Sequence, residues 1–509
     1  MSSIRRQSII ASLVIYLGFV VGMLNTYFFG SDKYFTGEQY GLTTIFVAIA
    51  QMMAALANFA MPSVIAKFYP YYKDHLPDRK NDMISIALMV GVAGFALVCL
   101  GGWIFRDLVV QKYSENAKDL VYYYFWTFPF GLGFTIFTIL EVYACNVGRP
   151  VLTNFLKEVQ WRLIVTVLIV LFIFSIIPDF SLFIKLYALA YPAIALTLLG
   201  YLIFTKRIHF TLQISKVTRR LYRKMLSFSF FLYSSFIVFT LAQVFDQLLI
   251  ASVLDEGIKK AGIFGLAQLM SNVILAPKRG IVAASIPVLS RAWKEKDYNK
   301  LQRIYQRSSI NQLLFSGGLF LLITLNYTEA IHTFQLKEEL LLGFTAFIVL
   351  GLTRVIEMGT GLNAEIIGTS AYYKFELISG LVLLSVMLPL SYILAKQFDI
   401  LGPAIANLIA IGLYNLVRLI FLWKKFGFMP FNQKTMYALL LGAACYGISW
   451  FLFREAAGIW GIVGRTALFG MLYVPGIIFF KITPDSQPVL ETIRKRLSKL
   501  TGSGRQSQR

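Results

Sequence analysis

Long apolar stretches separated by short polar ones run through the whole chain. Each stretch has roughly 20 residues, the length that an α-helix needs to cross the hydrocarbon core of a bilayer. We count fourteen, at residues 8–30, 40–62, 83–105, 120–144, 158–178, 182–205, 226–253, 261–284, 308–332, 341–362, 375–395, 401–423, 435–453 and 460–480. The pattern predicts an all-α integral membrane protein with about fourteen transmembrane helices.

Composition agrees with this pattern, because 57% of the 509 residues are hydrophobic and only 15% are charged. The formal net charge of +22 is a feature of many nucleic-acid-binding proteins. Here, however, Lys and Arg occur in short clusters between the apolar stretches, as in the cytoplasmic loops of membrane proteins. We therefore expect the lipid bilayer as a partner and no nucleic acid.

The distribution of Lys and Arg over the loops predicts the topology. If the N-terminus and every second loop lie on one side, that side carries 34 of these residues and the other side carries 11. Positively charged loops stay in the cytoplasm, so both termini are predicted to be cytoplasmic. This requires an even number of crossings, in agreement with fourteen.

Two cytoplasmic segments have amphipathic character. Within Lys216–Met225, the apolar residues Val217, Leu221 and Met225 recur every four residues among arginines and lysines. Residues 485–509 also have apolar residues at helical spacing among arginines and lysines. Such segments are typical of helices that lie on an anionic membrane surface. We predict this for both, with simple anchoring of the topology as the alternative role.

An internal repeat links the two halves of the chain. The stretch after Gly41 resembles the stretch after Gly262, and EVYACNVGRP from Glu141 resembles EMGTGLNAEIIG from Glu357. Copies with an even number of helices enter the membrane in the same orientation and enclose a cavity between them. The predicted parts are an N-terminal six-helix bundle (1–205), a cytoplasmic basic linker (206–225), a C-terminal six-helix bundle (226–424), helices 13 and 14 (425–484) and the amphipathic tail (485–509).

Several passages resemble the polysaccharide-transporter branch of the multidrug/oligosaccharidyl-lipid/polysaccharide (MOP) flippase superfamily. They are FDQLLIAS from Phe245, AGIFGLAQ from Ala261, with Phe264 where Tyr is usual, and the basic passage SIPVLSRAWKEKDYNKLQRI. The passage from Glu357 is similar to O-antigen flippase-like proteins of the Bacteroidota. The resemblance implies movement of a polyprenyl-diphosphate-linked oligosaccharide across the bacterial inner membrane for surface polysaccharide or lipopolysaccharide synthesis, next to other glycan-assembly proteins.

Charged residues within the apolar stretches are candidates for this work, because burying a charge in a membrane is costly. Six of the seven are expected at the cytoplasmic level: Arg162, Arg354, Arg418, Glu141, Glu158 and Glu357. We hypothesise that the three arginines line an inner vestibule and attract the lipid diphosphate, for which the guanidinium fork is suited. Glu141 and Glu357 would orient the arginines or repel the anion after reorientation. Alternatively, Glu158–Arg162 and Arg354–Glu357 neutralise each other on their own helices.

Asp246 is the seventh charge and stands alone in the apolar stretch 227–253, toward the outer side. With Gln243 and Gln247 nearby, it is a candidate coupling site for Na+ or H+; a partly solvated carboxylate near the outer interface is the alternative. We expect no other cofactor. Further polar residues are expected to face the sugar-bearing cavity, or else to hydrogen-bond between helices: Asn25, Gln51, Asn58, Gln268, Asn272 and Asn407.

Other functions remain as alternatives. A lipid II flippase and a cation-coupled drug exporter belong to the same class of transporter, although drug exporters of the superfamily resemble twelve-helix proteins. A membrane glycosyltransferase, polymerase or ligase resembles proteins with a large exported loop, and the exported loops here are short. The sequence has no metal-ligand spacing, nucleophile elbow or phosphate loop, so we expect no enzyme. A scaffold for a glycan-assembly complex stays open.

Overall fold

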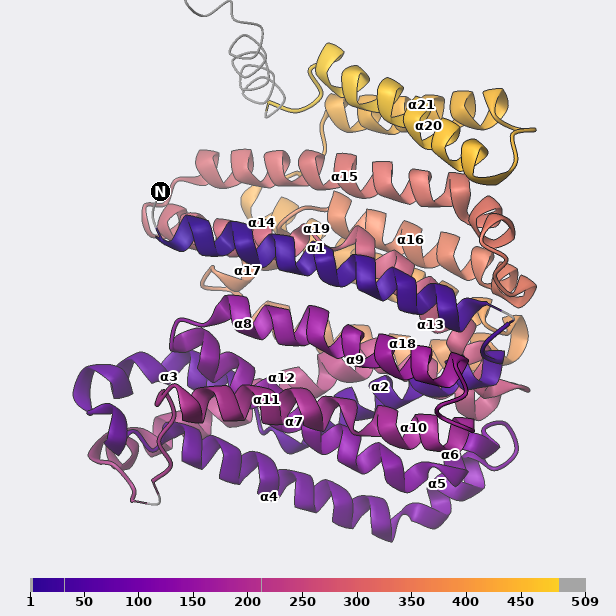
Figure 1. Ribbon diagram of the computed structural model, residues 1–509. Helices are drawn as coiled ribbons and strands as arrows, with labels where there is room; N and C mark the ends of the chain where they lie inside the picture. Colours follow the sequence, from indigo (N-terminus) through magenta and orange to yellow (C-terminus); the bar gives the residue numbers. More distant parts are fainter. Residues whose placement is uncertain (1–2, 32, 212, 485–509) are drawn as a thin grey trace, which may run out of the picture. The chain divides into compact units, whose positions relative to one another are not determined.

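The structure is a computed structural model that describes residues 3–31, 33–211 and 213–484. Over these ranges the chain consists of helices and connecting turns, with no strand (Figure 1). The predicted all-α fold is therefore confirmed. The amphipathic tail expected at residues 485–509 lies outside the described ranges.

Eleven helices of the described chain are long and apolar enough to cross a membrane, and Leu17–Gly30 is a shorter apolar helix. Each of the fourteen predicted stretches is helical over most of its length. The chain is thus a multi-pass membrane protein, whereas the number of fourteen crossings stays a prediction.

The helices fall into two compact units, and the boundary along the chain falls within α13 (Gly257–Ile274), between Gly265 and Leu266. The first unit contains α1 (Ser3–Gly30), α2 (Gly37–Ala57), α3 (Met61–His75), η1 (Asp78–Lys80), α4 (Met83–Ile104), α5 (Arg106–Tyr113), α6 (Lys118–Tyr122), η2 (Tyr124–Trp126), α7 (Thr127–Asn146), α8 (Pro150–Asn154), the π-helix η3 (Phe155–Gln160), α9 (Trp161–Ile173), α10 (Phe180–Ala188), α11 (Ala190–Phe204) and α12 (Lys216–Val253). The predicted domain boundaries stay predictions.

The second unit begins in α13 and continues through eight further elements and a short 3-10 turn. They are α14 (Lys278–Lys294), α15 (Tyr298–Thr333), η4 (Glu338–Leu342), α16 (Gly343–Gly359), α17 (Asn363–Gly368), α18 (Tyr373–Phe398), α19 (Leu401–Phe426), α20 (Gln433–Leu452) and α21 (Gly458–Phe479). Within this unit α18 packs along α19, and α15 packs against α16.

The basic segment before the seventh apolar stretch is not a separate surface helix, so that prediction was wrong. Residues 216–225 form the first turns of α12, which runs unbroken from Lys216 to Val253. No Pro or Gly occurs between these ends, so nothing in the sequence interrupts the helix. Ser215 begins the helix, since its side chain accepts a hydrogen bond from the Thr218 amide.

A chain of hydrogen bonds fixes this end of α12 within the first unit. Thr218 donates to the buried Asp82 carboxylate at 2.8 Å, and the Tyr72 hydroxyl lies 2.8 Å from the Thr218 hydroxyl. Burial raises the pKa of Tyr72 to about 12. Because a carboxylate accepts only, Thr218 donates to Asp82 and the protonated Tyr72 donates to Thr218.

The second apolar stretch is a broken helix. Between α2 and α3, Phe59 and Ala60 have φ values of 43° and 55°, a left-handed conformation that is uncommon for residues other than glycine. The break frees backbone carbonyls, and α12 satisfies two of them: Tyr233 donates to the Leu56 carbonyl at 2.8 Å and Ser229 to the Phe59 carbonyl at 2.5 Å. Such partners make a break tolerable inside a membrane.

Glycines allow α2 and α13 to approach closely inside the first unit. A Cβ on Gly262 would lie 2.8 Å from the Gly41 Cα, and a Cβ on Gly41 would lie 1.9 Å from the Ile258 carbonyl oxygen. Small residues at such crossings let membrane helices pack backbone to backbone. The packing is closest where the predicted repeat places its equivalent glycines.

Helices α20 and α21 lie side by side and pack on α15 (Figure 1). An ion pair that the sequence did not indicate holds their connection: Arg465 lies 3.5 Å from Glu329 of α15 and donates to the carbonyls of Phe453 and Ala456. The Arg465 side chain is 8% exposed, and the carboxylate of Glu329 neutralises its buried charge. The last two helices are therefore fixed to the second unit by both apolar contacts and charge.

Candidate functional site

An ionic cluster within the second unit brings together four of its polar side chains. The Glu357 carboxylate accepts from Lys278 Nζ at 2.7 Å and from Arg354 Nη1 at 3.1 Å. Arg354 Nη2 donates to the Asn272 side-chain oxygen at 3.2 Å. The cluster thus holds Arg354, Glu357 and Asn272, which the sequence had singled out, and Lys278, which it had not.

Local structure explains why these four side chains meet. Arg354 and Glu357 are three residues apart on α16 and therefore share one face of the helix. Asn272 lies in the last turn of α13, and Lys278 is the first residue of α14. Pro277 stands between these helices and ends the regular hydrogen bonding of α13, so the chain turns and brings Lys278 to the same place.

The charges of this cluster do not balance. Lys278 and Arg354 share the single carboxylate of Glu357, which leaves one positive charge in excess. The three side chains are 16–23% exposed, so the cluster is partly accessible. The Nε of Arg354 is buried and makes no hydrogen bond with any described residue. A buried donor without an acceptor is costly, and here it is an unused donor next to an excess cation.

The first unit holds a second cluster around Arg162. Arg162 Nη1 donates to the Glu158 carboxylate at 2.7 Å and to the Glu158 backbone carbonyl at 2.7 Å. Glu158 lies in η3, one turn before Arg162 in α9. One arginine is therefore neutralised by one acid of its own chain segment, as the alternative interpretation expected. π-helical turns such as η3 are frequent at functional sites.

Helix α1 closes this first-unit cluster. A Cβ on Gly18 would lie 2.8 Å from Arg162 Nη1, and a Cβ on Gly22 would lie 2.9 Å from its Nε. The two glycines form a notch for the guanidinium, which also lies 5.8 Å from the Phe19 ring centre. Asn25 continues the contact, since its amide donates to the Arg162 carbonyl at 2.8 Å. Arg162 is thus packed as well as neutralised.

The remaining predicted charges lie in other surroundings. Glu141 pairs with Lys157 at 3.2 Å rather than with an arginine. Arg418 is 6% exposed, hydrogen-bonds to the Tyr414 hydroxyl and lies 3.6 Å from the centre of the Tyr414 ring. Asp246 is 1% exposed and interacts with other groups of the protein. Its burial differs from the partly solvated carboxylate of the alternative interpretation.

The predicted polar residues take various positions. Asn58 is buried and donates to the Thr138 hydroxyl at 3.0 Å, and the buried Asn407 donates to the Pro403 carbonyl of its own helix. Gln51 and Gln268 are half-buried. Hydrogen bonds between helices account for Asn25 and Asn58, whereas the Asn272 side chain accepts from the guanidinium of Arg354, one of the arginines predicted to bind the diphosphate.

Sequence reasoning missed the two lysines that pair with the acids. Neither Lys278 nor Lys157 was among the seven candidate charges, because both were counted only toward the topology. The signal for Lys278 was its place directly after a proline at the end of an apolar stretch. Within the described ranges, no group of three or more His, Cys, Asp or Glu side chains is arranged to hold a metal ion.

Comparisons with known proteins agree with this architecture. Solved structures with the same fold include the lipid II flippase MurJ in an inward closed conformation, with a TM-score of 0.70, 14% identity and coverage of 93% of this chain and 99% of that chain. An inward-facing multidrug resistance MATE family transporter of the MOP superfamily has a TM-score of 0.64 and 14% identity over 82% of this chain and 98% of that chain. A MOP superfamily transporter from Pyrococcus furiosus has a TM-score of 0.54 and 15% identity over 83% and 95%.

Sequence comparison identifies the family. No curated protein sequence matches the chain. The sequence model of a family described as polysaccharide biosynthesis protein matches residues 4–293, which is more than half of the chain. The protein therefore belongs to the polysaccharide biosynthesis protein family and has the all-α fold of MurJ and the MATE transporters.

Proposed function

We propose that the protein moves a polyprenyl-diphosphate-linked oligosaccharide from the cytoplasmic to the periplasmic leaflet of the bacterial inner membrane by alternating access. Both termini lie in the cytoplasm in this proposal, and the two six-helix bundles enclose the path of the sugar. The product serves surface polysaccharide synthesis, such as that of lipopolysaccharide O-antigen. Membership of the polysaccharide biosynthesis family supports the substrate class, and the fold supports transport without covalent chemistry.

The observation that carries the proposal is the excess positive charge of the cluster around Arg354. A diphosphate offers several anionic oxygens, and guanidinium and ammonium groups bind such oxygens through charge-assisted hydrogen bonds. Arg354 has an unused Nε, and Lys278 provides a second cation at the same carboxylate. Glu357 neutralises part of this charge, and it would compete with the diphosphate for both cations. That competition favours release after the transporter has changed conformation.

The other arginines have secondary roles in this proposal. Arg418 adds positive potential from the second unit, with its guanidinium held on the Tyr414 ring. Arg162 is neutralised by Glu158 and packed by α1, so we propose that it contributes less to substrate affinity than Arg354. Asn272 orients Arg354 through its side-chain oxygen.

A transport assay in proteoliposomes tests the proposal. The protein is reconstituted with a fluorescent polyprenyl-diphosphate oligosaccharide, with lipid II and, separately, with a cationic dye. We expect movement of the oligosaccharide lipid, and an approximately 10- to 100-fold lower rate for Arg354→Ala, since hydrogen bonds to charged groups contribute about 1.5–3 kcal/mol. Arg220→Ala removes an exposed charge from α12 and is the control.

A wild-type transport rate for Arg354→Ala at normal protein levels would show that Arg354 does not contribute to transport. Movement of lipid II alone would assign a lipid II flippase, and export of the dye alone would assign a drug exporter.

Asp246 is proposed as the coupling site for Na+ or H+. Ionisable side chains buried in membrane helices are rare and often carry function, and Asp246 is 1% exposed within an apolar stretch. In the same assay, Asp246→Asn is expected to abolish the dependence of transport on an imposed Na+ or H+ gradient. An unchanged rate and unchanged ion dependence would contradict coupling through Asp246.

A further inference from the structure

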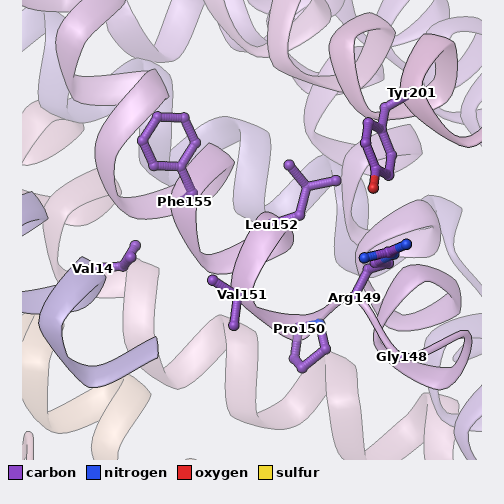
Figure 2. A pocket seen from close by; sticks show the side chains of 8 residues that line it. All are labelled: Val14, Gly148, Arg149, Pro150, Val151, Leu152, Phe155 and Tyr201. Carbon is purple, nitrogen blue, oxygen red and sulfur yellow. The ribbon is translucent and has the colours of Figure 1, made fainter. Parts of the chain in front are cut away.

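A crevice in the first unit is lined by none of the residues of the two ionic clusters. It has a volume of about 400 Å³ and is surrounded by α1, the segment from Gly148 through α8 to η3, and α11. Figure 2 shows Arg149 and Tyr201 on one side and Val14 of α1 on the opposite side. The remaining walls are apolar and include Pro150, Leu152 and Phe155. In the predicted topology this crevice opens at the cytoplasmic surface of the membrane.

Arg149 is the charged group of the crevice. Gly148, with a φ of +82°, allows the sharp turn after α7, and Pro150 then begins α8, so Arg149 is held between two conformationally restricted residues. The Nε of Arg149 is buried and makes no hydrogen bond with any described residue. Since buried polar groups in proteins nearly always have partners, this donor points to an acceptor that is not part of the protein.

The surroundings of Arg149 carry an excess of positive charge. The acid that precedes it on α7, Glu141, is already paired with Lys157 at 3.2 Å. Arg207 lies at the same turn, where it donates to the Val147 carbonyl at 3.1 Å. No described acid forms an ion pair with Arg149. An anion therefore fits this place better than a neutral ligand.

The second half of the chain has the same turn without the cation. Gly361, with a φ of +67°, follows α16 as Gly148 follows α7, and Leu362 stands before α17 where Arg149 stands before α8. Leu362 is apolar and buried. The arginine is therefore not required by the turn itself.

We propose that this crevice binds an anionic glycerophospholipid of the cytoplasmic leaflet, with its phosphate on Arg149 and Tyr201 and one acyl chain along the apolar wall. The guanidinium and the phenol supply hydrogen-bond donors for phosphate oxygens. The apolar walls accept methylene groups. A phosphodiester carries one negative charge and matches one unpaired guanidinium, whereas a diphosphate carries more charge than Arg149 alone neutralises. This lipid is a structural ligand and is distinct from the transported substrate.

The location suggests what the lipid does. It would wedge between α1 and the segment α8–η3, the two elements that also meet at Arg162. A bound lipid therefore stabilises the spacing of these elements.

Native mass spectrometry of the purified full-length protein tests the proposal. The protein in detergent is titrated with phosphatidylglycerol or phosphatidylcholine, and thermal unfolding is followed in the same samples. We expect one phosphatidylglycerol to be retained and to raise the unfolding temperature. Arg149→Gln should weaken its retention about tenfold, which is the effect of losing about 1.4 kcal/mol. Leu152→Trp, which fills the crevice and keeps Arg149, should weaken it as well. Arg220→Gln removes an exposed charge elsewhere and should bind like the wild type.

Several results would overturn the proposal. One is that the wild type, Arg149→Gln and Leu152→Trp retain phosphatidylglycerol equally well. Another is that the wild type retains phosphatidylcholine as well as it retains phosphatidylglycerol. Displacement of the lipid by millimolar inorganic phosphate would indicate a free phosphate site instead. Displacement by an equimolar polyprenyl diphosphate would assign the crevice to the transported substrate.

Discussion

The two arginine clusters are built alike but differ in charge. In the first unit Arg162 has the carboxylate of Glu158 to itself, whereas in the second unit Arg354 shares Glu357 with Lys278. Each arginine reaches an acid on its own helical segment, so the sequence spacing of the pairs is nearly the same. What differs is a cation brought in by the chain after α13. A pair that looks neutral in sequence can thus be one half of a positively charged site.

The clusters also differ in what covers the arginine. Gly18 and Gly22 of α1 press directly on the Arg162 guanidinium, and there is no room for a further side-chain atom. Arg354 keeps a buried Nε without an acceptor among the described residues. We infer that the first cluster mainly holds helices together and that the second is free to exchange partners.

The largest effect is expected when the notch of the first cluster is filled. A Cβ on Gly18 would lie 2.5 Å from the Glu158 carbonyl oxygen. Gly18→Leu should therefore lower the free energy of unfolding by about 3 kcal/mol, the upper part of the usual range for overpacking. Gly200→Leu is the control, because no heavy atom lies within 4 Å of its Cβ. Equal unfolding temperatures of the two variants in detergent would contradict the notch.

The second cluster can be given the charge balance of the first. Asn272→Asp adds a second carboxylate beside Arg354, which brings the net charge of the cluster to zero. The affinity for a polyprenyl diphosphate should fall about tenfold, corresponding to the loss of one charge-assisted contact. Asn299→Asp adds the same charge at an exposed position of α15 and should leave binding unchanged. Equal affinities of the two variants, measured by titration, would speak against an electrostatic role of the cluster.

Replacing each arginine by lysine tests whether its hydrogen bonds require two guanidinium nitrogens. Arg354 uses Nη1 for Glu357 and Nη2 for Asn272, and a single ammonium group lacks this fork. Arg162 makes both of its side-chain bonds to Glu158 from Nη1 alone. We expect transport to drop about fivefold in Arg354→Lys, a loss near 1 kcal/mol, and to change little in Arg162→Lys. A larger loss of transport in Arg162→Lys than in Arg354→Lys would mean that the first cluster, and not the second, binds the substrate.

The smallest effect is expected for Glu158→Gln. The backbone carbonyl of Glu158 still accepts from Arg162, and α1 still packs on the guanidinium. Both side chains of the pair are about one fifth exposed, so water screens part of their interaction. The free energy of unfolding should change by about 0.5 kcal/mol, with no gain in affinity for the lipid diphosphate. A marked gain in affinity would mean that Arg162 is accessible to substrate.

Much of the fold was predictable because membrane helices are long and apolar. Each of the fourteen apolar stretches is helical over most of its length. The breaks between α2 and α3 and between α13 and α14, by contrast, depend on tertiary partners. Ser229 and Tyr233, for example, satisfy the carbonyls freed at Phe59, and no local pattern links residues so far apart. The continuous α12 was also missed, since basic residues were taken to separate a surface helix from the membrane helix.

The candidate site was only partly predictable for the same reason. The pair Arg354–Glu357 follows from helical spacing, and its hydrogen bonds are those expected. Lys278 and Asn272 come from other helices, and only the turn at Pro277 brings Lys278 to the carboxylate. The pair of Arg465 in α21 with Glu329 in α15 was also missed, because the two residues lie on different helices.

The binding of a polyprenyl-diphosphate oligosaccharide to three variants tests the central claim most directly. Native mass spectrometry of the purified wild type, Lys278→Met, Arg354→Met and Glu357→Gln gives the four affinities. If excess positive charge binds the diphosphate, Lys278→Met and Arg354→Met bind more weakly than the wild type, and Glu357→Gln binds at least as tightly because it frees both cations. Equal affinities for all four proteins, or a loss in Glu357→Gln as large as that in Arg354→Met, would contradict the account.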